Sequence, residues 1–322
     1  MIRRDFLLAA MAATGALPAW GQAGYPSKPI RLIVGYAPGG ASDILARLMA
    51  QKLSVELKQP VIVENHPGAS GNIGTELVAR AEPDGYTLML GAAAQIAINP
   101  SLFKNIKVNP VTELVPISQL QVEHNVMVVN AGVPVNTVAE FVAYAKANQN
   151  KLSFSSAGTG APGHLVSELL NVKDNLKMTH VPYKGTGPSV NDVVAGHITM
   201  TMDSMVVLLP HIRSGKVRAL AVLSETRAEA APEIPTYREA GRSDLACTSW
   251  KGLFAPRGTP EAVTSRLHRA VQSILAEKEV RERLVGMGAE PLGSTPAQFS
   301  TYIRAETVKW AEIVKVSGAS ME

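Results

Sequence analysis

The segment VGYAPGGASD (residues 34–43) places two adjacent glycines, a serine and an acid at the start of a helical pattern. Gly39 and Gly40 permit positive φ and let a ligand approach the backbone closely. Backbone N–H groups at a helix start attract anions such as carboxylates. Ser42 is a good N-cap and Asp43 suits the first turn of a helix, so a capped turn without a ligand explains the segment equally well. Two readings therefore stay open, anion binding and a simple helix start.

A second glycine-rich segment, SAGTGAPGHLVSELL, spaces Gly158, Gly160 and Gly163 as G-x-G-x-x-G between a strand pattern and a helix pattern. Dinucleotide-binding loops have this spacing, but they also need an acid about 20 residues later, at the end of the next strand, to bind a ribose. The next strand here ends in THVPYKG, which holds no acid. The spacing therefore predicts no nucleotide cofactor, and it indicates a second anion-ready helix start with the hydroxyl of Thr159 beside it.

Patterns for catalysis and metal binding are weak in this chain. GASGN does not match the G-x-S-x-G nucleophile motif, and the seven histidines show neither H-x-x-x-H nor H-E-x-x-H spacing. Asp203 ends a predicted strand, where α/β proteins bind ligands, but it could equally cap the helix that follows. The run Met200, Met202 and Met205 is typical of core packing. We expect no catalytic residue, no metal site and no cofactor.

The elements that must position these loops follow from alternating apolar runs and amphipathic stretches. Strands are expected at residues 29–37, 60–65, 86–91, 122–130, 151–158, 178–183, 198–204, 217–224 and 250–256. Helices are expected at residues 41–57, 72–83, 138–148, 164–171, 189–197, 206–215, 260–288 and 296–318. This rhythm predicts an α/β protein of two lobes, each a mostly parallel sheet flanked by helices. Lobe 1 is expected at 24–125 plus 247–322 and lobe 2 at 126–246, with the ligand cleft between them.

The N-terminus and the composition indicate an exported globular protein. Residues 1–23 combine Arg3 and Arg4 with an apolar stretch and small residues before a cleavage point after Ala23, as in a secretory signal peptide. The arginine pair also suits a twin-arginine signal, so the Sec and twin-arginine routes both stay open. The net charge of +4 is spread without basic blocks and does not favour nucleic acid as a partner. Cys247 is the single cysteine, which excludes an intramolecular disulfide. We expect a periplasmic protein.

Several segments together resemble one family. They are KPIRLIVGYAPGGASD, VIVENHPGASGNIGTELVARAEPDGYTLMLG, SFSSAGTGAPGHL, HVPYKGTGPSVNDVVAGHITMTMDS, IPTYREAG and WKGLFAPRGTPEAV. In this order they resemble the extracytoplasmic solute receptors of tripartite tricarboxylate transporters, also called Bug receptors, from about Tyr25 to the C-terminus. The resemblance implies a periplasmic-binding-protein-like flytrap fold that holds a carboxylate between two loops, one from each lobe.

The resemblance also implies which residues line the cleft. The first-lobe loop would be Tyr36, Ala37, Pro38, Gly39, Gly40, Ala41, Ser42 and Asp43. The second-lobe loop would be Ser156, Ala157, Gly158, Thr159 and Gly160, with His164 on the following helix. Asp203 and the turn Gly91, Ala92, Ala93 and Gln95 should line the same cleft. Tyr36 stands where the family often has Phe, so its phenol would add a hydrogen bond.

The implied function is capture of a small organic carboxylate and its delivery to a permease of one large and one small membrane subunit. A dicarboxylate, a tricarboxylate and an aromatic acid all stay open as ligands, and we expect a monomer. An exported α/β enzyme that uses Asp43, His164 or Asp203 as acid–base groups is the alternative. A sensory receptor that presents its ligand to a signalling partner is a further one.

Overall fold

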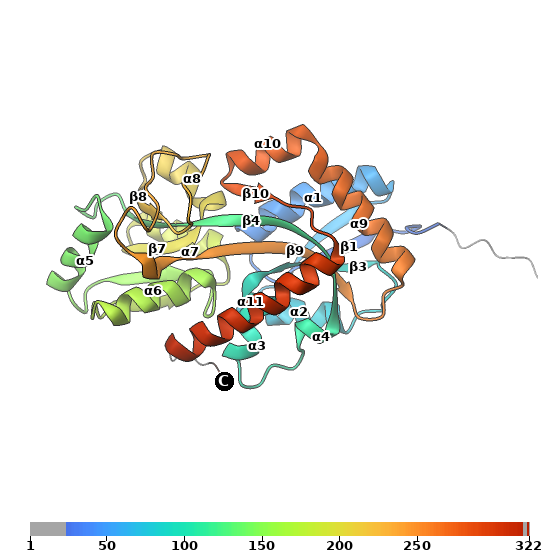
Figure 1. Ribbon diagram of the computed structural model, residues 1–322, viewed down its shortest axis with the longest axis horizontal. Helices are drawn as coiled ribbons and strands as arrows, with labels where there is room; N and C mark the ends of the chain where they lie inside the picture. The colour runs from blue at the N-terminus through green and yellow to red at the C-terminus, as the bar shows by residue number, and fades with distance from the viewer. Residues whose placement is uncertain (1–23, 318–320, 322) are drawn as a thin grey trace, which may run out of the picture.

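Two long antiparallel strands, β4 (Leu114–Asn130) and β9 (Thr248–Pro256), run side by side through the centre of the molecule and join two lobes (Figure 1). The structure is a computed structural model that describes residues 24–317 and 321. The expected signal peptide at 1–23 lies outside the described residues. Among the described residues, no helix is long and apolar enough to cross a membrane.

The first lobe surrounds one end of the two central strands. Its strands are β1 (Ile30–Val34), β2 (Val61–Asn65), β3 (Thr87–Ala92) and β10 (Ala289–Pro291). Its helices are α1 (Ala41–Leu57), η1 (Ala69–Gly71), α2 (Asn72–Ala79), η2 (Ala94–Ile98), α3 (Asn99–Leu102), α4 (Pro110–Glu113), α9 (Glu261–Ala276), α10 (Lys278–Gly286) and α11 (Pro296–Ser317). The strand order is β2-β1-β3-β9-β4, with β10 paired to β4. Strand β1 runs parallel to β2 and β3, and β9 runs antiparallel to β3.

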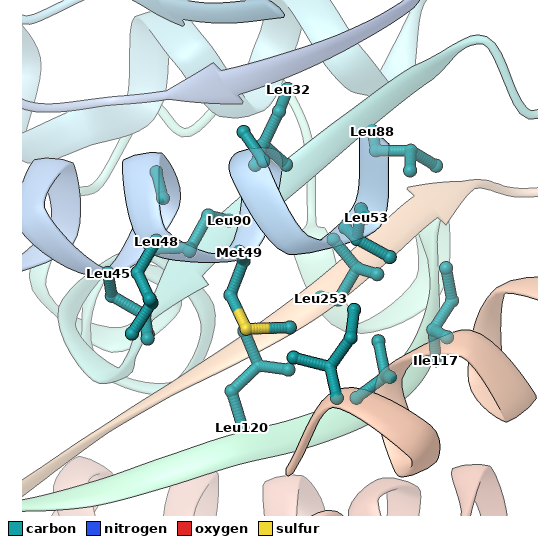
Figure 2. Close-up of a cluster of buried hydrophobic side chains, with 14 of the residues drawn as sticks. Leu32, Leu45, Leu48, Met49, Leu53, Leu88, Leu90, Ile117, Leu120 and Leu253 are labelled. Atoms are coloured by element: carbon teal, nitrogen blue, oxygen red, sulfur yellow. The ribbon is translucent and has the colours of Figure 1, made fainter. Parts of the chain in front are cut away.

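The core of this lobe fixes the position of α1. Its buried side chains Leu45, Leu48, Met49 and Leu53 recur at helical spacing and face the sheet (Figure 2). They meet apolar side chains of β1, β3, β4 and β9, namely Leu32, Leu88, Leu90, Ile117, Leu120 and Leu253. Burying one such side chain contributes about 1.5–3 kcal/mol. The cluster therefore holds α1 against the sheet with its first turn at the carboxyl end of β1.

The second lobe surrounds the other end of β4. Its strands are β5 (Ser153–Ser156), β6 (Thr179–Pro182), β7 (Met200–Ser204) and β8 (Val217–Val222). Its helices are α5 (Val138–Ala147), α6 (Pro162–Lys173), α7 (Thr186–Ala195), α8 (Met205–Arg213) and η3 (Ser243–Leu245). The order is β4-β7-β5-β6, with β8 also paired to β4. Met200, Met202 and Met205 are fully buried, which confirms the prediction of core packing.

The expectation of mostly parallel sheets holds for β1, β2 and β3 in the first lobe and for β5, β6 and β7 in the second. The pairings β1–β2, β1–β3, β5–β6 and β5–β7 are parallel, whereas every pairing given above for β4 and β9 is antiparallel. The strand predicted at 122–130 matches only the second half of β4. Its first half carries polar residues and two register shifts, near Pro116 and Gln119, which hide the strand pattern. The prediction of one helix at 260–288 is wrong, because Glu277 has ψ 126° and separates α9 from α10.

Candidate ligand-binding site

A cavity lies between the two lobes, with the central strands forming part of its wall. From the first lobe it is lined by Tyr36, Gly40, Ala41, Ser42, Ala92 and Ala94. From the second lobe it is lined by Ala157, Ala161, Pro162, Gly163, Thr186, Asp203 and Ser204. The chain of β4 and β9 contributes Glu123, Asn125, Ser249 and Lys251. Most of these side chains are small, so backbone groups are accessible from the cavity.

Four helices begin at this cavity, one in the first lobe and three in the second. The first residues or N-caps of α1, α6, α7 and α8 all line it. None of the four N-caps, which are Gly40, Ala161, Gly185 and Ser204, makes a side-chain capping hydrogen bond. The first N–H groups of a helix carry a positive partial charge and have no partner within the helix. The arrangement therefore offers hydrogen-bond donors to an anion from both lobes.

Asp43 shapes the loop that precedes α1. Its Oδ2 accepts hydrogen bonds from the N–H of Gly39 at 3.0 Å and from Arg47 Nε at 2.9 Å, and its Oδ1 accepts one from Asn65 Nδ2 at 3.0 Å. Burial alone would raise the pKa of Asp43, but these hydrogen bonds outweigh it and hold the pKa below its ordinary value. Both oxygens are thus occupied within the first lobe. Asp43 therefore positions the loop, and it is not among the residues that line the cavity.

The first lobe touches the second lobe directly, through the loop before α1 and through η1. The N–H of Ala37 donates to the carbonyl oxygen of Lys184 at 2.9 Å, and Ser70 Oγ donates to the carbonyl oxygen of Thr159 at 2.5 Å. A Cβ added at Gly40 would lie 3.6 Å from the backbone nitrogens of Thr186 and Gly187. These contacts show the lobes closed upon each other.

The second-lobe loop depends on three glycines. Gly158 and Gly160 have positive φ, at 143° and 83°. Gly163 lets the start of α6 approach β7, since an added Cβ would lie only 1.6 Å from the carbonyl oxygen of Met202. The close packing that this spacing provides in dinucleotide-binding folds thus occurs here as well.

Two histidines, the buried His164 on α6 and the half-buried His180 on β6, support this loop. His164 Nδ1 accepts the N–H of Gly160 at 3.1 Å, and His180 Nε2 lies 2.8 Å from Ser156 Oγ. Their rings lie against each other, with centroids 4.1 Å apart. Burial, with the neighbouring His180, lowers the pKa of His164 to about 3, and burial lowers the pKa of His180 to about 4. Both rings are therefore neutral near pH 7.

Glu168 joins these histidines in a group whose ligand atoms lie within 4.8 Å of one another, a spacing that could suit a metal ion. Because Nδ1 of His164 accepts a backbone N–H, the neutral ring carries its proton on Nε2. Metal coordination by Nε2 would require the other tautomer, which would place two N–H groups against each other. The geometry of His164 therefore favours a structural role.

The chain is similar in sequence and in fold to known proteins over most of its length. The family model described as "Tripartite tricarboxylate transporter family receptor" matches residues 45–319. The chain belongs to this receptor family. The receptor is 36% identical to Protein BugT of Bordetella pertussis over 299 residues, 92% of each chain. It is 32% identical to MatC from Rhodopseudomonas palustris, solved with bound malate, with a TM-score of 0.86 and coverage of 90% and 100%. It is 31% identical to R. palustris Rpa4515, solved with adipate, with a TM-score of 0.89 and coverage of 92% and 99%.

The cavity of the receptor brings together only part of the residues expected there. It is lined by Tyr36, Gly40, Ala41, Ser42, Ala92, Ala157 and Asp203. Not among its lining residues are Ala37, Pro38, Gly39, Asp43, Gly91, Ala93, Gln95, Ser156, Gly158, Thr159, Gly160 and His164. Gln95 instead bonds the backbone of Ala92 and Gly71, and Gly158 and Thr159 line a neighbouring groove. Several of these residues therefore shape or adjoin the binding loops.

Sequence reasoning missed the polar wall that the receptor builds from its central strands. Lys251 Nζ lies 2.5 Å from Glu123 Oε1, and both side chains are buried. Ser204 Oγ donates to Glu123 Oε2 at 2.8 Å, and Gln121 Nε2 donates to Oε1 at 2.5 Å. The sequence did contain a signal for this wall, because Glu123 and Lys251 both lie within predicted strands. Charged side chains rarely occupy a strand that is buried on both faces.

Asp203 is a second acid in the wall of the cavity, beside Glu123. Its Oδ1 accepts from Thr186 Oγ1 at 3.0 Å and from the N–H of Ser204 at 2.7 Å, while its buried Oδ2 has no hydrogen-bond partner among the described residues. Burial raises the pKa of Asp203 to about 6, although these hydrogen bonds and Lys251 oppose the shift. Burial and the Asp203 charge also raise the pKa of Tyr36. The Tyr36 phenol therefore stays protonated, and its OH donates to the carbonyl oxygen of Ser70 at 3.4 Å.

Proposed function

We propose that this receptor binds a small organic carboxylate in the cavity between its lobes and delivers it to a tripartite membrane transporter. The observation that carries the proposal is the convergence of four helix starts without side-chain caps on one cavity, from both lobes. Neutral backbone donors hold an anion without committing it to a permanent salt bridge. When the lobes separate, the donors of the two lobes separate as well, and the anion is released.

The relatives support a carboxylate as the ligand. Two structures of the same fold and 31–32% identity hold malate and adipate, both of which are aliphatic carboxylates. The alanines of the cavity, Ala92, Ala94, Ala157 and Ala161, leave an apolar space suited to a short hydrocarbon chain. We therefore favour an aliphatic acid over an aromatic one.

We also propose how the chain is exported, how it is divided into lobes and which partners it meets. Residues 1–23 direct export, and the mature receptor acts as a monomer in the periplasm with the large and small transporter subunits as partners. Lobe 1 comprises 24–125 and 247–322, and lobe 2 comprises 126–246. Both boundaries fall at the central strands, inside β4 and just before β9, which supports a hinge at these strands.

Binding is better supported than catalysis. Of the three acid–base candidates, only Asp203 lines the cavity. Asp43 is hydrogen-bonded to Gly39, Arg47 and Asn65, and His164 is hydrogen-bonded to Gly160. Asp203 accepts hydrogen bonds from Thr186 and Ser204, and Glu123 pairs with Lys251, so the charged groups of the cavity do not form a nucleophile–base pair. We therefore propose that the receptor releases its ligand chemically unchanged.

The test is a calorimetric and thermal-shift screen of the purified mature chain against aliphatic di- and tricarboxylates, monocarboxylates and aromatic acids. Mass spectrometry of acid extracted from freshly purified protein identifies a native ligand. We expect a one-to-one complex with an aliphatic acid that is recovered intact after incubation. Absence of binding to every acid, or conversion of the bound acid to a product, would overturn the proposal.

A further inference from the structure

Lys251 is a buried cation in the wall of the cavity. It lies on β9, and only 4% of the residue is exposed. Its Nζ carries three N–H donors, and the one acceptor recorded for it among the described residues is Glu123 Oε1. Burying an ammonium group is costly unless its charge and its donors are matched. Lys251 therefore has unused donor capacity at a surface that a ligand reaches.

Glu123 does not depend on Lys251 alone. Its Oε1 also accepts a hydrogen bond from Gln121, and its Oε2 accepts one from Ser204 Oγ. Ser204 is the N-cap of α8, so the positive end of this helix lies beside the carboxylate. The negative charge of Glu123 is thus shared among three donors and a helix start. Part of the Lys251 charge remains available to a second anion.

The central strands hold the pair in a fixed position. Gln121 lies opposite Lys251 in the β4–β9 register, and Glu123 lies opposite Ser249. Glu123 and Lys251 are therefore diagonal neighbours, within reach of long side chains on one face of the sheet. The 2.5 Å contact with Glu123 Oε1 holds the Lys251 ammonium group at this place in the wall. Glu123 thus acts as a positioning residue for Lys251.

We propose that Lys251 binds the second acidic group of the ligand and makes this receptor selective for aliphatic dicarboxylates. This inference rests on the proposed function. One carboxylate takes the donors at the helix starts, the hydrocarbon chain crosses the alanine-lined space, and the distal carboxylate accepts from Lys251 Nζ. Asp203 and Glu123 place negative charge on the same cavity and disfavour a third carboxylate.

The test compares straight-chain dicarboxylates from succinate to adipate with monocarboxylates of the same carbon number, by calorimetry at constant pH and ionic strength. We expect the wild-type receptor to bind the best dicarboxylate at least about tenfold more tightly than its matched monocarboxylate. In Lys251→Gln the dicarboxylate should lose that advantage, while the monocarboxylate affinity changes less than about threefold. Equal affinity for both acids in the wild type overturns the inference even where a carboxylate binds, so its failure differs from failure of the proposed function.

A structural role for Lys251 predicts a different result. The variant would then lose thermal stability and retain the wild-type ratio of dicarboxylate to monocarboxylate affinity, which also overturns the inference. If Lys251→Gln does not fold, the double variant Glu123→Gln, Lys251→Met removes both charges together and avoids an unpaired buried carboxylate. Loss of dicarboxylate selectivity in this double variant supports the inference, and retained selectivity contradicts it.

Discussion

The N–H of Ala37, in the loop before α1, donates a 2.9 Å hydrogen bond to the carbonyl oxygen of Lys184, in the loop before α7. This bond joins the two lobes beside the cavity. Next to it, Gly40 and Gly187 bring the starts of α1 and α7 into backbone contact, since a Cβ at Gly187 would lie 3.1 Å from the carbonyl carbon of Gly39. Closure of the receptor therefore requires small residues at these two positions.

Gly40→Val should weaken ligand binding without unfolding the receptor. Gly40 has φ −83°, which any residue adopts, so the separated lobes tolerate a side chain there. In the closed state the branched side chain would meet the start of α7. We expect about a tenfold or greater rise in Kd by calorimetry with little change in the Tm of the ligand-free protein. Gly40→Ala is the matched control, because its Cβ fits at 3.6 Å and should retain near-native affinity. Equal losses of Tm and affinity in the valine variant would contradict this prediction.

Gly163→Ala should destabilise the second lobe. The added Cβ would lie 1.6 Å from the carbonyl oxygen of Met202, so α6 must move away from β7. We expect a loss of about 1–3 kcal/mol or more in the free energy of unfolding, measured by urea denaturation. Gly286→Ala, whose Cβ meets nothing within 4 Å, is the control and should be close to neutral. A stable Gly163→Ala variant would show that the two elements pack less closely.

Ionisation of Asp203 should destabilise the receptor and oppose ligand binding. The unfolded residue titrates near pH 4 and the folded one at about 6, so the folded state holds its proton more strongly. Stability from this group is present below pH 4 and falls as pH rises through about 6. Asp203→Asn should therefore be more stable than wild type by up to about 3 kcal/mol at pH 8, with a difference that vanishes near pH 4. Denaturation across this pH range measures the effect.

The same titration predicts a pH-dependent affinity. A carboxylate ligand is repelled by ionised Asp203, so the wild-type affinity should rise several-fold as pH falls from 7 through about 6. Asp203→Asn should bind with an affinity that is nearly constant over this range. A pH profile shared by both proteins would assign the effect to another group.

His164 and His180 should remain neutral throughout the physiological range. Burial lowers their pKa values to about 3 and about 4, so neither ring should titrate between pH 5 and 8 in heteronuclear NMR spectra. His164 should show the tautomer with its proton on Nε2, because Nδ1 accepts the N–H of Gly160. A bound metal or a charged ring would change both signals.

Glu306→Ala should release α11 from β9. The indole Nε1 groups of Trp250 and Trp310 both donate to Glu306 Oε2 at 3.0 Å, and all three residues are buried. Removing the acceptor leaves two buried donors unpaired, which costs about 1–3 kcal/mol each. We expect a loss of about 2–5 kcal/mol in the free energy of unfolding, with a change in tryptophan fluorescence. Exposed Glu312 on the same helix provides the control, since Glu312→Ala should change stability by less than about 0.5 kcal/mol.

Elements with a strong local pattern were predictable. Helix α1 occupies the predicted residues 41–57, because its apolar spacing and its glycine start are both encoded within one segment. Strand β4 was only half predicted, because its first half derives its strand conformation from pairing with β9 across more than a hundred residues of intervening chain. Local propensity does not report such pairing.

The sequence by itself determined the two glycine loops, the βα rhythm that places them at helix starts, and the resemblance to a receptor family, since each is written in contiguous residues. Only the tertiary structure decided which residues face the cavity. In the folded chain Asp43 accepts a hydrogen bond from the N–H of Gly39 in its own loop, and His164 accepts one from the N–H of Gly160. The tertiary structure also brought Lys251 to Glu123, 128 positions earlier in the chain, through the pairing of β4 with β9. The direction of a side chain and its distant neighbours depend on long-range packing, and no short segment contains that information.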